Sequence, residues 1–201
     1  MLDLSKQPIG MGKERMCFVH PDDPRLAVKV PTGGTDLQTR REIRFYRQLA
    51  KRGNVECKHI PAFHGTCETS RGNGIVVDLV RDFDGQISRP LGWYLGSGYP
   101  LEEFIPRLDE IRHSFVENLI IFNHDLNIGN LLVKKTSASR FHLVAIDGLG
   151  DVVAIDWLNR IPFLARRKIK RRWQRFMERI YRSREVALQR ETLTRDRQAE
   201  R

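Results

Sequence analysis

The first eighty residues alternate short apolar runs with turn-forming residues, a pattern that predicts a β-sheet with one helical interruption. The apolar runs predict five strands, over residues 2–9, 16–20, 26–30, 60–65 and 74–80. Between the third and fourth runs, apolar residues recur every three or four positions and predict a helix over residues 37–51. Thr35 or Asp36 is the expected N-cap of this helix, and Gly53 is its expected stop.

The second half of the chain predicts helices around one short pair of strands. Residues 81–88 are polar and contain glycine, which is typical of a linker. A helix is expected before residue 122, with Pro106 in its first turn. Its apolar positions are Leu108, Ile111, Phe115, Leu119 and Ile120. The elements expected after it are a loop over 123–130, strands over 131–133 and 141–146, and a helical segment from Trp157 onward.

Length and composition allow one sizeable core or two small lobes that share an interface. The chain has 201 residues, of which 40% are hydrophobic and 30% are charged. No apolar run approaches the roughly 20 residues that a membrane span needs, and the first residues lack the layout of a secretory signal. The three cysteines form no CxxC pair, so we expect reduced thiols and a cytoplasmic location.

The positive charge is concentrated in one segment. The formal net charge is +10, and residues 166–184 hold ten arginines and lysines with one acid, which gives that segment a charge of +9. The rest of the chain is therefore close to neutral. This distribution needs an explanation of its own.

The basic segment also carries an apolar stripe, which predicts an amphipathic helix over residues 164–184. The stripe consists of Ile169, Trp173, Phe176, Met177, Ile180 and Tyr181. Three interpretations remain open. In the first, the stripe packs on a helical lobe while a basic face meets solvent. In the second, residues 166–184 attract anionic lipid headgroups, which would place the protein peripherally at the inner membrane. In the third, these residues hold nucleic acid, which is the less favoured partner.

The segment from Phe122 to Gly148 holds the residues best suited to chemistry. Asp125 and Asn130 lie in a loop that leads into an apolar strand, and Asp147 ends the next strand. Carboxylate and amide oxygens are hard ligands that suit magnesium, and a carboxylate near a hydroxyl accepts its proton. Aspartate and asparagine are also favoured in turns, so this spacing alone does not separate a site from turn chemistry.

In chain order, these residues resemble the protein-kinase-like superfamily. There an Asp-x-x-x-x-Asn motif supplies the base and a metal ligand, as Asp125 and Asn130 would here, and a following Asp-x-Gly supplies the main metal ligand, as Asp147 would. The superfamily places a lysine on its third strand and a glutamate on the next helix. Lys29 and Glu42 occupy those places. A glycine loop covers the phosphates, and the matching residues are Gly10 and Gly12.

Four strings narrow the resemblance to the bacterial YrbL family, which is named after a protein of the PhoP regulatory network and assigned to the kinase-like superfamily. They are Gly-Met-Gly-Lys-Glu-Arg, Asp-Phe-Asp-Gly-Gln-Ile-Ser, His-Asp-Leu-Asn-Ile-Gly-Asn and Ile-Asp-Gly-Leu-Gly. The resemblance implies a bilobal α+β fold with a five-stranded antiparallel sheet and one helix in the N-terminal lobe. The implied parts are residues 1–80 as the nucleotide-binding lobe, 81–88 as the hinge, 89–184 as a small helical lobe, and 185–201 as a polar tail.

The implied activity is transfer of the γ-phosphoryl group of ATP, with Mg²⁺, to a hydroxyl of a small molecule, an envelope glycolipid or the chain itself. The implied catalytic residues are Asp125, Lys29 and Glu42, and Gly10, Gly12 and Lys29 would bind the nucleotide. Asn130 and Asp147 would hold the metal. The alternative is a non-catalytic pseudokinase that acts through nucleotide binding or the basic helix. The presence of all four charged residues, Lys29, Glu42, Asp125 and Asp147, favours activity.

The chain departs from the superfamily around its catalytic loop. Asn123 stands where histidine is usual, and the neighbouring His124 is interpreted as a core hydrogen-bonding residue. Asp151 is either a further metal neighbour or a solvated carboxylate, and Asp156 is either a brace for the loop or a helix N-cap. A third glycine, the phenylalanine of Asp-Phe-Gly and a full activation segment are missing. A peptide substrate is therefore less expected than a small one.

Overall fold

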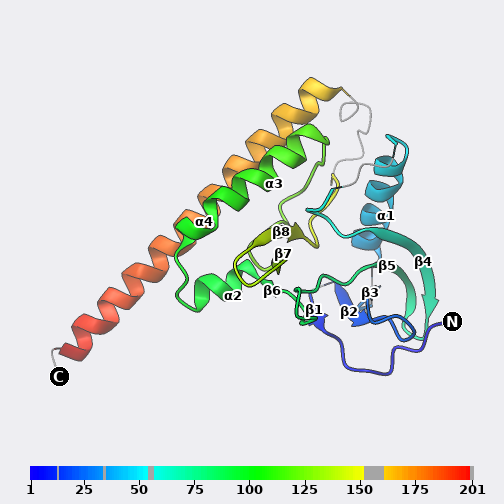
Figure 1. The fold of residues 1–201 in the computed structure, drawn as a ribbon, viewed down its shortest axis with the longest axis horizontal. Coiled ribbons are helices and arrows are strands. Elements are labelled where there is room, and N and C mark those ends of the chain that lie inside the picture. The colour runs from blue at the N-terminus through cyan, green and yellow to red at the C-terminus, as the bar shows by residue number, and fades with distance from the viewer. Residues whose placement is uncertain (13, 34, 54–56, 152–160, 200–201) are drawn as a thin grey trace.

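A computed structural model describes residues 1–12, 14–33, 35–53, 57–151 and 161–199, with side chains described up to residue 183 (Figure 1). Asp156, a predicted brace or N-cap, lies outside the described residues. No described helix is long and apolar enough to cross a membrane.

The N-terminal part is a five-stranded antiparallel sheet, as predicted, in the order β1-β2-β3-β5-β4. Its strands are β1 (Gly10–Met11), β2 (Arg15–Val19), β3 (Leu26–Pro31), β4 (Phe63–Thr69) and β5 (Gly72–Asp78). The predicted strand over residues 2–9 is wrong, because only Leu2 bridges the sheet, beside Thr69. Pro8 interrupts that segment and has no N–H to donate to a ladder.

Helix α1 (Leu37–Ala50) packs on one face of the sheet, because its stripe of Phe45, Tyr46 and Leu49 shares a core with inward-facing sheet residues. The opposite face is covered by the N-terminal segment, with Leu4 beside Phe18 and Val28. The helix was predicted over residues 37–51 and ends one residue earlier. The Asp36 side chain forms no capping hydrogen bond, because its carboxylate accepts from Arg40 at 2.7 Å.

The second part is a small sheet flanked by helices. Its elements are β6 (Arg89–Pro90), α2 (Leu91–Gly96), a 3-10 turn η1 (Leu101–Glu103), α3 (Ile105–Glu117), β7 (Leu131–Lys135), β8 (Phe141–Ala145) and α4 (Pro162–Ala199). The β7–β8 hairpin matches the predicted pair of strands, and α3 has Pro106 in its first turn as predicted. Helix α3 ends at Glu117, however, so Leu119 and Ile120, which were predicted as helical positions, lie after it. The pattern did not predict β6, α2 or η1, which are two to six residues long and too short for a periodic signal.

Helix α4 lies alongside α3 and completes the core of this part (Figure 1). The predicted stripe packs inward through Ile169, Trp173, Phe176 and Ile180. Tyr181 is the exception, because 52% of it is exposed to solvent. The helical backbone also continues to Ala199, through most of the segment that was predicted to be a polar tail.

The packing of α4 on α3 predicts very different costs for two aromatic truncations on the same helix. Trp173 is buried and stands 6.5 Å from the Phe115 ring and 6.0 Å from the Phe122 ring, between centroids. Trp173→Ala is expected to lower the free energy of unfolding by about 3–5 kcal/mol in urea titrations. Tyr181→Ala is the matched control and should cost less than about 1 kcal/mol. An equal loss of unfolding free energy in the two variants would contradict this packing.

Candidate functional site

Lys29 and Glu42 form a buried ion pair between the sheet and helix α1. Lys29 lies on β3 and Glu42 on α1, and the Lys29 Nζ to Glu42 Oε1 distance is 2.8 Å. Nζ also donates to the backbone oxygen of Ile146 at 2.6 Å, just after β8. The two residues that were predicted together from element order are therefore in contact, and Lys29 joins the two parts of the molecule.

Arg15 also belongs to this candidate site, and no pattern in the sequence predicted it. It begins β2, and its side chain is only 6% exposed. Its guanidinium donates to Glu42 Oε2 at 2.5 Å and to Asp147 Oδ1 at 2.7 Å. Arg15, Lys29, Glu42 and Asp147 thus form one ion cluster with two positive and two negative groups, so the cluster carries no net charge.

The Asp147 carboxylate is held from several directions. Besides Arg15, its oxygens accept hydrogen bonds from Gln38 Nε2 at 3.1 and 3.3 Å and from the Gly148 N–H at 2.6 Å. Burial alone would raise the pKa of Asp147, but the charges of Arg15 and Lys29 outweigh it and hold the pKa below its usual value. Asp147 is therefore a charged carboxylate near neutral pH.

Asp125 lies in a loop that is tied to the Asp147–Gly148 turn. Asn123, which replaces the usual histidine, is buried and accepts the Asp125 N–H at its Oδ1, at 2.7 Å. The Asn123 N–H donates to Gly148 O at 2.8 Å. Asn130 Nδ2 donates to Asp125 O at 2.8 Å. Asn123 and Asn130 therefore fix the backbone on both sides of the predicted base.

The Asp125 carboxylate itself is accessible, with 31% of the side chain exposed. Arg41 Nη1 of α1 is 3.4 Å from its Oδ2, and His124 Nε2 is 3.3 Å from its Oδ1. The interpretation of His124 as a core residue is wrong, because its side chain is 77% exposed. The loop turns the side chain outward, and the core position is taken by Asn123.

Helix α4 holds the same loop from the other side. Arg172 donates to the backbone oxygen of Phe122, and Arg179 Nη2 donates to that of Leu126 at 3.0 Å. Asp151 pairs with Lys168 and with Arg172, the latter at 2.8 Å. The interpretation of Asp151 as a solvated carboxylate is therefore wrong, because its side chain is buried and serves as a counter-ion of α4, while its role as a metal neighbour stays a prediction.

Gly10 and Gly12 lie in the β1–β2 hairpin, but the predicted arrangement of a glycine loop after a long first strand is wrong. Gly10 is itself in β1, opposite Cys17, and the Gly12 N–H donates to Arg15 O at 2.8 Å to close the turn. This hairpin is connected to the ion cluster through the Arg15 side chain.

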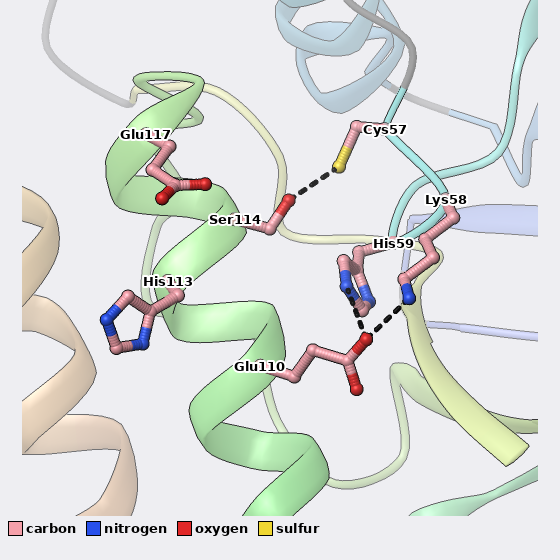
Figure 2. Close-up of a pocket in the computed structure, with 7 residues that line it drawn as sticks. All are labelled: Cys57, Lys58, His59, Glu110, His113, Ser114 and Glu117. Carbon is pink, nitrogen blue, oxygen red and sulfur yellow. Dashed lines mark hydrogen bonds and ion pairs between the residues drawn. The ribbon is translucent and has the colours of Figure 1, made fainter.

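A hollow of about 610 Å³ lies between residues 57–59 and α3, away from the predicted site residues (Figure 2). Glu110 points toward Lys58, at 2.5 Å, and toward His59, whereas His113 and Glu117 point elsewhere. Cys57 Sγ contacts Ser114 Oγ at 3.3 Å. Within the described ranges, no group of three or more histidine, cysteine or acidic side chains is placed to hold a metal.

Comparison with known proteins identifies relatives and a shared fold. The family model of PhoP regulatory network protein YrbL matches residues 2–181. YrbL of Escherichia coli is 32% identical over 184 residues, which covers 88% of this chain and 87% of that protein. YrbL of Shigella flexneri matches to the same extent.

Among solved structures, two double-mutant crystal structures of the Mycobacterium tuberculosis PknI kinase domain superpose with TM-scores of 0.51, at 16% and 17% identity. The matches cover 71% of this chain and 56% and 58% of the kinase domains, so the chain spans little more than half of that domain. The predicted bilobal, kinase-like α+β fold is confirmed.

The contact between Gly148 and the loop predicts an unusually costly glycine substitution. Gly148 has a φ of 76°, and an added Cβ would lie 2.4 Å from Leu126 N and 2.9 Å from Asp125 C. Gly85→Ala is the matched control, because Gly85 has a φ of 85° but open space around it. In chemical denaturation, Gly148→Ala should be less stable than Gly85→Ala by at least about 1–3 kcal/mol. Equal stability of the two variants would show that the loop does not pack on Gly148.

Proposed function

The chain belongs to the YrbL family, and from that premise we propose that it is a kinase-like phosphotransferase. It would transfer the γ-phosphoryl group of ATP, with Mg²⁺, to a hydroxyl of a small molecule, an envelope glycolipid or the chain itself. The observation that carries the proposal is the ion cluster. It brings Lys29, Glu42 and Asp147 together from elements far apart in the chain, and Gly148 places Asp125 beside them.

Lys29 is suited to hold nucleotide phosphates. A lysine ammonium has three hydrogen-bond donors. Two of them are used, on Glu42 and on Ile146 O, which leaves one donor for a phosphate oxygen. Glu42 fixes the direction of that donor. Gly10 and Gly12 are the proposed cover for the phosphates, because their hairpin leads directly into Arg15.

Asp147 and Asn130 supply the oxygen donors that Mg²⁺ prefers, so their chemistry fits this ion. The Asn130 Nδ2 bond to Asp125 O orients the amide, and within the described residues its Oδ1 accepts no hydrogen bond. When bound there, Mg²⁺ would neutralise phosphate charge. Asp147 Oδ1 is already paired with Arg15, so Arg15 and a metal ion compete for this oxygen, and we expect the ion to displace the guanidinium.

Asp125 is the proposed general base. Its carboxylate is partly exposed and its backbone is fixed by Asn123 and Asn130, so it is placed to accept a proton from an incoming hydroxyl. Arg41 and His124 lie against its two oxygens and keep the side chain directed away from the core.

The second candidate function is a regulatory pseudokinase that binds nucleotide without transfer. The Arg15–Asp147 pair favours it, because a buried guanidinium that stays on the carboxylate competes with a metal ion for it and neutralises its charge. The two functions differ in whether phosphate is transferred and in whether Arg15 leaves Asp147.

Transfer is tested with radiolabelled ATP and Mg²⁺, with nucleotide binding followed by calorimetry in parallel. We expect Asp125→Asn to bind ATP as the unmodified chain does and to lose autophosphorylation or ATP turnover by about 10²–10⁴-fold, since only the proton acceptor is removed. Asp109→Asn, on an exposed face of α3, should change neither ATP binding nor phosphate transfer. Binding without turnover in the unmodified chain would favour the pseudokinase, and absence of nucleotide binding would refute both.

The exchange of Arg15 is tested with the metal ion alone, through the thermal unfolding midpoint. Arg15→Gln leaves the ion cluster with one excess negative charge and should lower stability by about 3–5 kcal/mol. Mg²⁺ or Mn²⁺ should then raise the midpoint of Arg15→Gln more than that of the unmodified chain, because a ligand stabilises the state that it binds.

Two further variants assign this metal response to Asp147. The double variant R15Q/D147N should lose it, because the excess charge is gone. Arg25→Gln, at an exposed arginine, should respond as the unmodified chain does. The same metal response in Arg15→Gln and the unmodified chain would mean that Arg15 does not compete for the Asp147 site.

A further inference from the structure

The cations of α4 divide into two groups that face in different directions. Lys168, Arg172 and Arg179 point inward, where they hold Asp151 and the backbone around Asp125. The other described cations of the helix are exposed, and none of them forms an ion pair or hydrogen bond with the described residues. They are Arg166, Arg167, Lys170, Arg171, Arg175 and Arg182. Intramolecular contacts therefore explain only part of the basic segment.

Two exposed aromatic side chains lie on the same side of the helix as these cations. Phe163 is 69% exposed and Tyr181 is 52% exposed. They are eighteen residues apart, which is five whole turns, so both lie on one line along the helix, about 27 Å apart at 1.5 Å per residue. At 100° per residue this line runs among the exposed cations. It lies about 120° around the helix from the middle of the buried stripe that packs on α3.

We propose that this outer face of α4, formed by Phe163, Tyr181 and the six exposed cations, binds the surface of an anionic lipid bilayer. Positive charge attracts the headgroups, and amphipathic aromatic rings are stable at the boundary between headgroups and acyl chains. Glu178 is the one acid on this face up to residue 183, and it accepts a hydrogen bond from Gln174. Charge repulsion from the protein is therefore small.

The geometry favours a bilayer over nucleic acid. Phosphate binding would use the cations but would leave the aromatic rings without a function, because rings about 27 Å apart do not stack on neighbouring bases. A straight helix presents both rings to one plane. A flat anionic surface therefore uses both the exposed cations and the exposed rings of this face.

The bilayer contact would lie on the helix that holds the predicted catalytic loop. Arg172 and Arg179 reach Phe122 and Leu126 from the inner side of α4, while the cations that meet the bilayer occupy the outer side. Lipid binding and loop position are therefore linked through one rigid element. The proposal does not depend on phosphotransfer.

Flotation of the full chain with lipid vesicles tests the proposal. The chain should float with phosphatidylcholine vesicles that contain about 30% phosphatidylglycerol and should stay behind with phosphatidylcholine alone. Binding should weaken in about 0.5 M NaCl, where the Debye length falls to a few ångströms. The fourfold variant R166Q, R167Q, K170Q and R171Q should bind at least about a hundredfold more weakly. The double variant F163S and Y181S should bind more weakly at every salt concentration.

A second fourfold variant controls for net charge. K6Q, R44Q, K51Q and R140Q remove the same charge from exposed positions outside α4 and should leave vesicle binding unchanged. All variants should unfold at the same temperature as the unmodified chain, because each altered side chain is exposed. Equal losses in the two fourfold variants would refute a specific face. The proposal would also be refuted if the unmodified chain bound labelled RNA tightly but did not bind vesicles, and if the α4 fourfold variant lost the RNA binding.

Discussion

The site depends on the burial of two cations with two carboxylates where the sheet of the N-terminal part meets the hairpin of the second part. Taking a single charge out of water costs several kcal/mol, and the cost is offset only when its partner is buried with it. Arg15 and Lys29 share Glu42, and Arg15 also reaches Asp147, so none of the four side chains is placed independently. The relative position of β3, α1 and the strand before Asp147 is therefore set by charge balance as well as by packing. The Arg15 Nε atom has no partner among the described atoms, so one hydrogen-bond donor of the guanidinium is left unsatisfied although the charges balance.

Sequence reasoning predicted the parts of the site that depend on element order. Lys29 and Glu42 are thirteen positions apart on a strand and the next helix, and that separation places them on facing surfaces. Strands β2, β3, β4 and β5 and the helices of more than ten residues followed from apolar periodicity, whereas β1 did not. Arg15 could not be found this way, because its partners are 27 and 132 positions away and an arginine at the start of a strand is usually solvated. The short elements β6, α2 and η1 carry no periodic signal, and the outward turn of His124 depends on the buried Asn123 beside it.

Helix α4 explains how a chain that matches little more than half of a kinase domain holds its predicted catalytic loop in place. Its apolar stripe closes the core against α3, and Arg172 and Arg179 bind backbone oxygens on either side of Asp125. Asp151 neutralises part of that charge from inside. The sequence predicted the stripe but not the division of the arginines, because both groups have the same composition and differ only in which side of the helix they occupy. Tyr181 was assigned to the wrong side for the same reason: at the border of the stripe, helical spacing alone does not decide exposure.

A crystal structure of the full chain with Mg²⁺ and a non-hydrolysable ATP analogue would show whether the ion cluster is a nucleotide site. We expect phosphate oxygens within hydrogen-bond distance of Lys29 Nζ, a metal ion on Asp147 and Asn130, and the Arg15 guanidinium moved away from Asp147. The Lys29–Glu42 pair should remain at its present separation. A nucleotide bound elsewhere, or a nucleotide at Lys29 with Arg15 still on Asp147 and no metal ion at that carboxylate, would contradict this expectation.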